Sequence, residues 1–253
     1  MSTDSYKHSH TWNAWLGVLV GIGALFGSQI IAGIFLSIYP LIRHWSVQRG
    51  NSWLNNSILA QFSYVLIAES IAVGLVYIYL NKDKVKLKAI GLRKPKLLDP
   101  VFGLMGLPAY FVIYFVLLNV AIKIFPNLNV NEKQQIGFTG VHGGPEIILS
   151  FISLVILPPI AEEIIFRGLI FTSLRKKMKV WLAAIITSLL FASLHLPEGG
   201  SAGPLYIAAI DTFSLSLVLV YLREKTGGLY ASMTLHGLKN LIAFIALLAL
   251  HQL

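Results

Sequence analysis

The feature that most constrains this chain is a series of apolar runs long enough to cross a lipid bilayer. The hydrocarbon core of a bilayer is crossed by about 20 helical residues. The sequence is 56% hydrophobic and only 12% charged, which is outside the range of ordinary soluble domains. The composition therefore predicts an all-α fold, a polytopic membrane helix bundle of about seven transmembrane helices. The predicted spans are 15–41, 58–80, 101–125, 147–174, 180–195, 205–222 and 229–250.

These spans divide the chain into three parts. Residues 1–14 form a polar N-terminal tail, residues 15–125 hold three transmembrane helices, and residues 147–250 form a four-helix core. The first span is too long for a signal-peptide core and lacks an A-x-A cleavage site, so we expect it to stay attached. Two glycine pairs in it, Gly17/Gly21 and Gly23/Gly27, have the spacing that permits close helix packing, and we expect this packing to be internal.

The basic residues predict how the bundle is oriented. Lys and Arg concentrate in cytoplasmic loops, and fourteen of the twenty fall on one side of the predicted spans against three on the other. The richest stretch is a linker at 81–100, predicted to lie on the cytoplasmic surface. This partition places the N-terminus in the cytoplasm and the C-terminus outside. The formal net charge of +9 indicates membrane lipids as partners and no nucleic acid.

Ionisable side chains inside spans identify a candidate site, because each costs at least about 2.5 kcal/mol near a helix centre on insertion scales. They concentrate in three segments of the last four spans, and the absence of cysteine excludes thiol chemistry. Glu163 and Arg167 lie four residues apart, which predicts an ion pair along one helix face. Glu162 points elsewhere, and His236 and Asn240 share a face of the last helix. The three segments contain Glu162, Glu163 and Arg167, then Phe191 and His195, then His236 and Asn240.

Two hydrolytic chemistries fit this set. In one, Glu162 is a general base that activates water with help from His195, while His236 and Asn240 stabilise the oxyanion. In the other, Glu162, His195 and His236 bind zinc, which activates the water instead. The His-x-x-x-Asn spacing and the lack of His-Glu-x-x-His favour the version without a cofactor. A structural role remains open for Glu163 and Arg167, and packing is expected for Phe191.

Three other charged residues in the spans are assigned structural roles. Glu69 and Asp211 have no partner nearby in the sequence, and we expect them to form hydrogen bonds between helices. Lys239 lies off the face shared by His236 and Asn240, so we expect it to pair with another group.

The three motifs resemble those of the CAAX protease and bacteriocin-processing (CPBP/Abi) family of intramembrane endopeptidases, which is similar to type II CAAX prenyl endopeptidases. The resemblance rests on Glu-Glu-x-x-x-Arg at Glu162, Phe-x-x-x-His at Phe191 and His-x-x-x-Asn at His236. It implies that residues 147–250 are the catalytic core, and the family's usual eight spans allow one helix more than we count.

The resemblance also implies roles for these residues. Glu162 corresponds to the catalytic glutamate, His195 to a residue that helps to activate water, and His236 and Asn240 to the oxyanion site. Glu163 and Arg167 then support the site, with zinc possible but not favoured. The implied substrate is a membrane-associated protein or peptide, and a bacterial source would place the chain in the plasma membrane.

Two other functions compete with proteolysis. A bacteriocin-immunity or peptide-binding membrane protein would use the same cavity without hydrolysis. A small transporter would use the carboxylates to carry ions or protons, but it leaves the His236 and Asn240 pair unexplained.

Overall fold

The computed structural model describes residues 12–131, 134, 137–138, 140–141, 143–197 and 203–249. Most of the predicted N-terminal tail therefore lies outside the described residues. Within these residues, six helices are long and apolar enough to span a membrane, and a seventh apolar helix has 14 residues. The predicted all-α membrane bundle is confirmed, and the chain is an integral membrane protein by the length and composition of its helices. The elements are α2 (Ala14–Ile42), α3 (Val47–Asn56), α4 (Ile58–Lys82), η1 (Leu87–Ile90), α5 (Leu98–Ile124), α6 (Gly144–Phe151), η2 (Ile152–Ile156), α7 (Leu157–Glu162), η3 (Glu163–Ile170), α8 (Phe171–Arg175), α9 (Val180–Ser193), α10 (Tyr206–Thr226) and α11 (Tyr230–Ala249).

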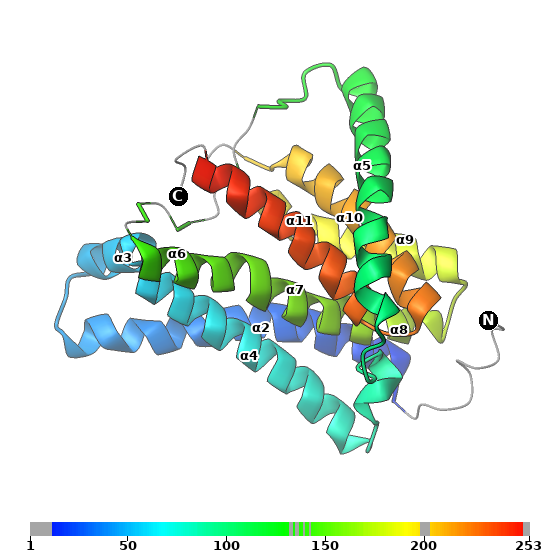
Figure 1. Cartoon of the computed structure of the whole chain (residues 1–253). Helices are drawn as coiled ribbons and strands as arrows, with labels where there is room; N and C mark the ends of the chain where they lie inside the picture. The colour runs from blue at the N-terminus through cyan, green and yellow to red at the C-terminus, as the bar shows by residue number, and fades with distance from the viewer. Residues whose placement is uncertain are drawn as a thin grey trace.

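One composite helix, running from α6 to α8, forms the axis of the bundle. Its middle part lies between α4 on one side and α11 on the other (Figure 1). Nearly every side chain of its η3 and α8 segments is buried. This segment was predicted as the single span 147–174, and the structure extends it by three residues at the N-terminal end and one at the other.

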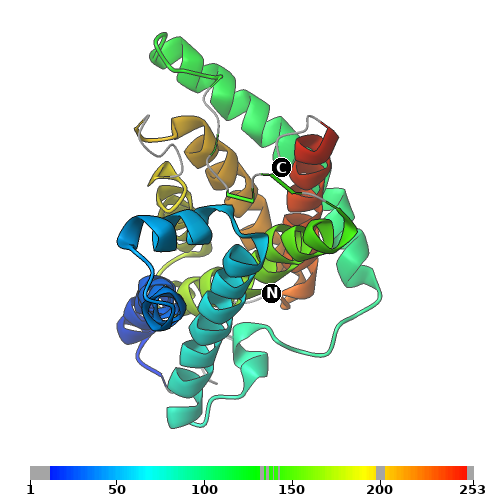
Figure 2. The same cartoon turned by 90° about the vertical axis from the view of Figure 1, so that its left-hand side faces the viewer.

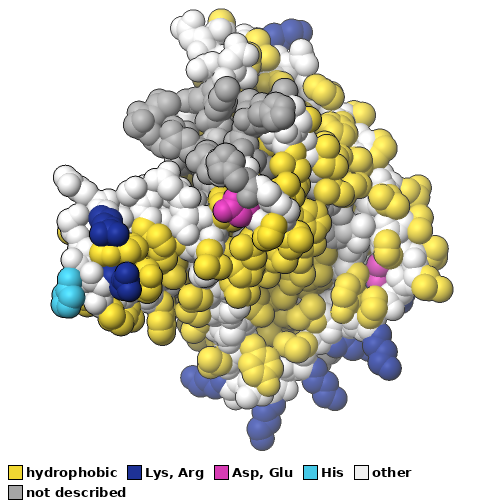
Figure 3. Space-filling model, turned by 60° about the vertical axis from the view of Figure 1, so that its left-hand side comes forward, with side chains coloured by type: hydrophobic (Ala, Val, Ile, Leu, Met, Phe, Trp, Pro, Cys, Tyr) yellow, Lys and Arg dark blue, Asp and Glu magenta, His cyan; other side chains and the backbone are white. Residues whose placement is uncertain are grey.

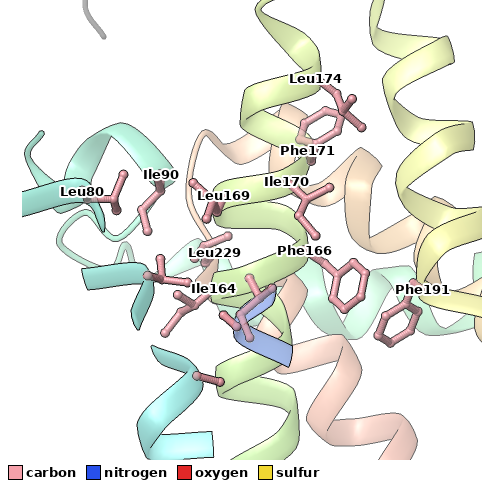
Figure 4. Close-up of a cluster of buried hydrophobic side chains, with 14 of the residues drawn as sticks. Leu80, Ile90, Ile164, Phe166, Leu169, Ile170, Phe171, Leu174, Phe191 and Leu229 are labelled. Carbon is pink, nitrogen blue, oxygen red and sulfur yellow. The ribbon is translucent and has the colours of Figure 1, made fainter. Parts of the chain in front are cut away.

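The core around this axis is formed by apolar side chains from helices that are distant in sequence. Figure 4 shows Phe166 of η3 facing Phe191 of α9, with Leu229 and Ile90 packed against the other side of η3. The two phenylalanine rings cross nearly edge to face, with centroids 4.9 Å apart. A side chain such as Phe contributes about 1.5–3 kcal/mol when fully buried. These contacts fix the rotation of η3, and so the directions of its charged side chains.

The glycine pairs of α2 behave differently from each other. A β-carbon at Gly21 would lie 2.6 Å from Ile170, and one at Gly17 would collide with Ser173, so both glycines let α2 approach η3 and α8 closely. In the part of the chain that the structure describes, Gly23 and Gly27 have nothing within 4 Å of that position. The first pair therefore packs internally, as expected, whereas the second faces outward.

The outer surface is apolar, as a lipid-facing surface must be. Figure 3 shows hydrophobic side chains covering most of one face, with Lys and Arg gathered along its lower edge. Helix α5 covers α10 and α11, and its far end projects beyond the other helices in both cartoon views (Figures 1 and 2). Many α5 side chains, such as Val112, Phe115 and Val116, are more than half exposed, as lipid contact permits.

The basic linker follows the surface but is anchored to the bundle. Its lysines are exposed, whereas Ile90 is fully buried and the Gly91 carbonyl accepts a hydrogen bond from Leu229 N (3.1 Å). Arg93 donates from its two terminal nitrogens, Nη1 and Nη2, to the two carboxylate oxygens of Asp99 at 2.9 and 2.6 Å. Gly91 has φ of 94°, a conformation that favours glycine, and Arg223 would collide with a side chain there.

A short helix, α3, was not predicted. It lies after α2 and joins an aromatic cluster of Tyr39, Trp45 and Trp53, with Arg49 over the Trp45 ring at 4.5 Å. Tyr and Trp gather at bilayer interfaces because one end of each ring system is apolar and the other polar. This cluster indicates the interface at the end of the bundle opposite the basic linker.

Candidate active site

The backbone near the site departs from regular α-helix at two places. Segments η2 and η3 have wide, π-helical turns, and the amide of Phe171 accordingly donates to the carbonyl of Phe166, five residues back. Such turns often occur at functional sites. Pro158 follows η2 and has no N–H, so it cannot donate to the carbonyl of Leu154 four residues earlier.

Asn240 supplies the missing donor. Its side-chain amide Nδ2 donates to the Leu154 carbonyl at 2.9 Å and so joins α11 to η2. Gly237, one turn earlier in α11, allows close approach, because a β-carbon there would lie 3.6 Å from the Val155 carbonyl. The proline pair at 158 and 159 therefore leaves a carbonyl without a backbone donor, and Asn240 of the last helix supplies one.

The predicted ion pair of Glu163 and Arg167 is confirmed. Arg167 Nη1 lies 2.8 Å from Glu163 Oε1, and both side chains are 0% exposed. Arg167 also donates from Nη2 to Ser216 Oγ of α10 at 2.7 Å, and its guanidinium lies 4.5 Å from the centroid of the Phe191 ring. A buried charge is tolerated only with such partners. This pair therefore ties η3 to α9 and α10.

His236 is held between the two adjacent glutamates. Its Nδ1 donates to Glu163 Oε1 at 3.2 Å, and its Nε2 lies 3.7 Å from Glu162 Oε2. The Glu162 side chain is 22% exposed, whereas the His236 side chain is 5% exposed. Because a carboxylate only accepts hydrogen bonds, the Glu163 contact fixes a proton on Nδ1 and leaves Nε2 facing Glu162.

Phe191 connects the histidines. Its ring centroid lies 4.9 Å from that of His195 and 5.8 Å from that of His236. His195 Nδ1 donates to the Phe191 carbonyl at 2.9 Å, which sets the orientation of the imidazole. The structure thus brings Glu162, Glu163 and His236 into direct contact. It places His195 beside them across Phe191, and Asn240 one helical turn beyond His236.

Among the described residues, no group of three or more His, Cys, Asp and Glu side chains is arranged to hold a metal ion. Glu162, His195 and His236, the alternative zinc ligands, do not form such a group. Binding of zinc by these three residues stays a prediction to be tested.

The three other charged residues in the spans have different surroundings. Asp211 of α10 accepts a hydrogen bond from Tyr110 of α5 and lies 2.8 Å from Lys239 Nζ of α11. These contacts are the hydrogen bonds between helices expected for Asp211, and the pairing expected for Lys239. Glu69 instead lines a cavity of about 500 Å³ on the other side of α7.

Three polar contacts, two at the site and one beside it, were not predicted. Ser216 binds Arg167, the Leu154 carbonyl binds Asn240, and Tyr110 binds Asp211. Only the Leu154 carbonyl had a signal in the sequence, because the Pro158–Pro159 pair removes two helix donors. The other two depend on how α5 and α10 are rotated, which the weak periodicity of these helices does not fix.

Comparison with known proteins agrees with the motifs. Residues 144–242 match the family model for Rce1-like proteins, described as type II CAAX prenyl endopeptidase Rce1-like. The match includes every candidate site residue and confirms the resemblance to CAAX proteases. No solved structure matches this chain.

Two curated relatives are similar to parts of the chain. An uncharacterized protein of Mycoplasma capricolum subsp. capricolum is 27% identical over 242 residues, which cover 90% of this chain and 68% of that protein. An uncharacterized 24.3 kDa protein of Escherichia coli is 33% identical over 94 residues, 36% of this chain and 41% of that protein.

Proposed function

With the Rce1-like match of residues 144–242 as the premise, we propose that this chain is an intramembrane endopeptidase that hydrolyses a peptide bond of a membrane-associated protein or peptide. The observation that carries the proposal is the contact of His236 with both Glu162 and Glu163, from helices 73 residues apart in sequence. A buried acid–imidazole cluster is costly in a membrane bundle and has the groups that proton transfer to and from water requires.

In the proposed reaction, Glu162 is the general base. It takes a proton from water as the water oxygen bonds to the scissile carbonyl carbon, and this step produces a tetrahedral oxyanion. The C–N bond then breaks, and the proton held by Glu162 passes to the leaving amine. His195 helps to orient the water. The partial exposure of Glu162, compared with the complete burial of Glu163, supports this division of roles.

Glu163 and Arg167 act as positioning residues for His236. Arg167 keeps Glu163 ionised in a buried environment, and Glu163 accepts the Nδ1 proton of His236. The imidazole is therefore held with Nε2 toward Glu162. Nε2 can donate only when it carries a second proton, in the imidazolium form whose charge the two flanking carboxylates offset. The Nε2–H of that form is the proposed donor to the oxyanion.

Asn240 is the second proposed oxyanion donor. A side-chain amide has two N–H groups, so one can hold the Leu154 carbonyl while the other binds the substrate oxygen. The same contact fixes the side chain in advance, and preorganised donors are the ones that lower the barrier most.

The proposal is tested with purified protein in liposomes and a panel of membrane-anchored peptides, half of them prenylated. Wild type cleaves at least one peptide, and Glu162→Gln lowers that rate by about 10²–10⁴-fold because the base is lost. Glu224→Gln is the matched control, since Glu224 pairs with Arg175 outside the site. Cleavage undiminished by Glu162→Gln contradicts the proposal.

The same assay separates the alternatives. An immunity or peptide-binding protein would retain the peptides uncleaved, with equal retention by wild type and Glu162→Gln. A chelator arm tests zinc: we expect activity to survive complete metal removal. Loss of activity that added zinc restores would favour the zinc mechanism instead.

We also propose that the basic linker and the N-terminus face the cytoplasm of a bacterial plasma membrane. The Lys and Arg distribution and the relatives from two bacteria support this. Because the chain has no cysteine, single cysteines at Lys84 and Gln48 can be labelled selectively. We expect a membrane-impermeant reagent outside intact cells to label only the Gln48→Cys variant. Labelling of the Lys84→Cys variant alone would show the opposite orientation.

A further inference from the structure

The cavity beside α7 lies away from His236 and has its own chemistry. It has a volume of about 500 Å³ and is bounded by α4, the η1 region and α7. Its lining is apolar apart from Glu69 and a few neutral polar groups. Ile160 and Ala161 of α7 form part of its wall. Ala161 directly precedes Glu162, which contacts His236.

Glu69 sits near the middle of the membrane-spanning α4. Within the described part of the chain, its carboxylate forms no hydrogen bond and no ion pair, and no basic side chain lines the cavity. The prediction that it bonds to another helix is therefore wrong for the described residues. An acid at this depth costs about 2.5 kcal/mol or more unless a cation or donor meets it.

The wall of α4 has the shape that a helix needs to dock. Ser70 and Gly74 are four residues apart on the cavity side, which is the small-xxx-small spacing found where transmembrane helices approach closely. Among the described residues, a β-carbon at Gly74 would meet nothing within 4 Å, so they leave the space beside it open. A lipid acyl chain would fill an apolar groove but would leave the carboxylate of Glu69 unpaired.

We propose that this groove docks a membrane-spanning helix of another protein or peptide that carries a Lys or Arg side chain opposite Glu69. The charge complementarity selects the basic residue, and Ser70 and Gly74 admit the helix backbone. Binding of this kind does not require hydrolysis, so it can be tested separately from the proposed function. A helix held here would lie next to the segment of α7 that leads into Glu162.

The test measures binding of synthetic helices in liposomes by energy transfer. One probe is a 20-residue Leu/Ala helix with a single central Lys, and the other has Leu in place of that Lys. We expect wild type to prefer the Lys helix by about tenfold, and Glu69→Gln to abolish the preference, because a desolvated ion pair is lost. The Glu162→Gln variant should keep the full preference, which separates this result from any failure of catalysis.

A second variant tests the groove by shape. Gly74→Leu should fill it and weaken binding of both helices, whereas Gly23→Leu, on the open face of α2, should leave binding unchanged. Equal binding of the two helices to wild type, or a preference that survives Glu69→Gln, overturns the proposal. The proposal is also overturned if lipid or a second copy of the chain fills the groove. That result would appear as lipid retention or self-association that Gly74→Leu removes and the other variants do not.

Discussion

The first three long helices and the last four spans bury different kinds of side chain. Of sixteen buried polar or charged residues among those described, only Ser28 and Asp99 precede residue 143. Helices α2, α4 and α5 pack through glycine and alanine, as at Gly21 and Gly103, whereas the region after residue 143 packs around Glu163, Arg167 and His236. Close packing is sufficient to hold a bundle together in lipid. The buried charges of the second region therefore require a different explanation, and chemistry is the one we propose.

The largest expected effect breaks the buried ion pair. Arg167→Met leaves Glu163 as an uncompensated buried charge, which costs about 3–5 kcal/mol. We expect a steep loss of thermal stability in detergent, measured by unfolding. The double variant Glu163→Met with Arg167→Met should recover much of the stability but no activity. Equal stability of wild type and Arg167→Met would show that the two regions are not distinguished by this pair.

The next effect separates the two proposed roles of Asn240. Asn240→Ala removes both a donor to Leu154 and a proposed oxyanion donor, so we expect a loss of about 10²–10³-fold in turnover. Stability should fall by only about 1–3 kcal/mol, the cost of one unsatisfied buried carbonyl. Turnover and unfolding are measured on the same preparations. A stability loss with normal turnover would assign Asn240 to structure alone.

The close packing of the outer helices is tested at Gly103 of α5. A β-carbon there would lie 2.7 Å from both the Ala231 carbonyl and Thr234, so Gly103→Ala should cost about 1–3 kcal/mol through overpacking. Gly27→Ala on α2 should cost almost nothing, because no described residue lies within 4 Å of the added carbon. Unfolding in detergent measures both. Equal effects would mean that α5 is not held by close approach to α11.

The smallest effect concerns the network around Asp211. Tyr110→Phe removes one hydrogen bond but keeps the aromatic ring and the Asp211–Lys239 ion pair. We expect a loss of about 1 kcal/mol in stability and no change in turnover. A strong loss of turnover would instead show that this network takes part in the reaction.

Hydrophobic length and helical spacing were enough to predict the spans and one ion pair from the sequence. Six of the seven predicted spans agree with long apolar helices among the described residues to within four residues, whereas the span predicted at 180–195 is the 14-residue helix α9. The Glu163–Arg167 pair results from their four-residue separation. The resemblance implied only that Glu163 and Arg167 support the site, whereas the structure shows the contact by which Glu163 does so: its Oε1 lies nearer to His236 than Glu162 Oε2 does. Whether a side chain meets another helix depends on rotation, and α4 and α5 are too uniformly apolar for periodicity to fix it.

Two further features could not be predicted from the sequence, because they also depend on contacts between helices. Helix α3 is short and polar, and its stability depends on contacts such as that of Arg49 with Trp45. The π-helical turns depend on how η2 and η3 pack, although Pro158 marks where the ordinary pattern is interrupted.

The central claim is that Glu162 and its neighbours cut peptide bonds within the membrane. The most direct measurement compares the new protein termini in membranes of bacterial cells producing wild type or Glu162→Gln at equal amounts. We predict a set of termini, within or beside transmembrane segments, that appears with wild type and is absent with the variant. The same termini in both, or none in either, would contradict the account.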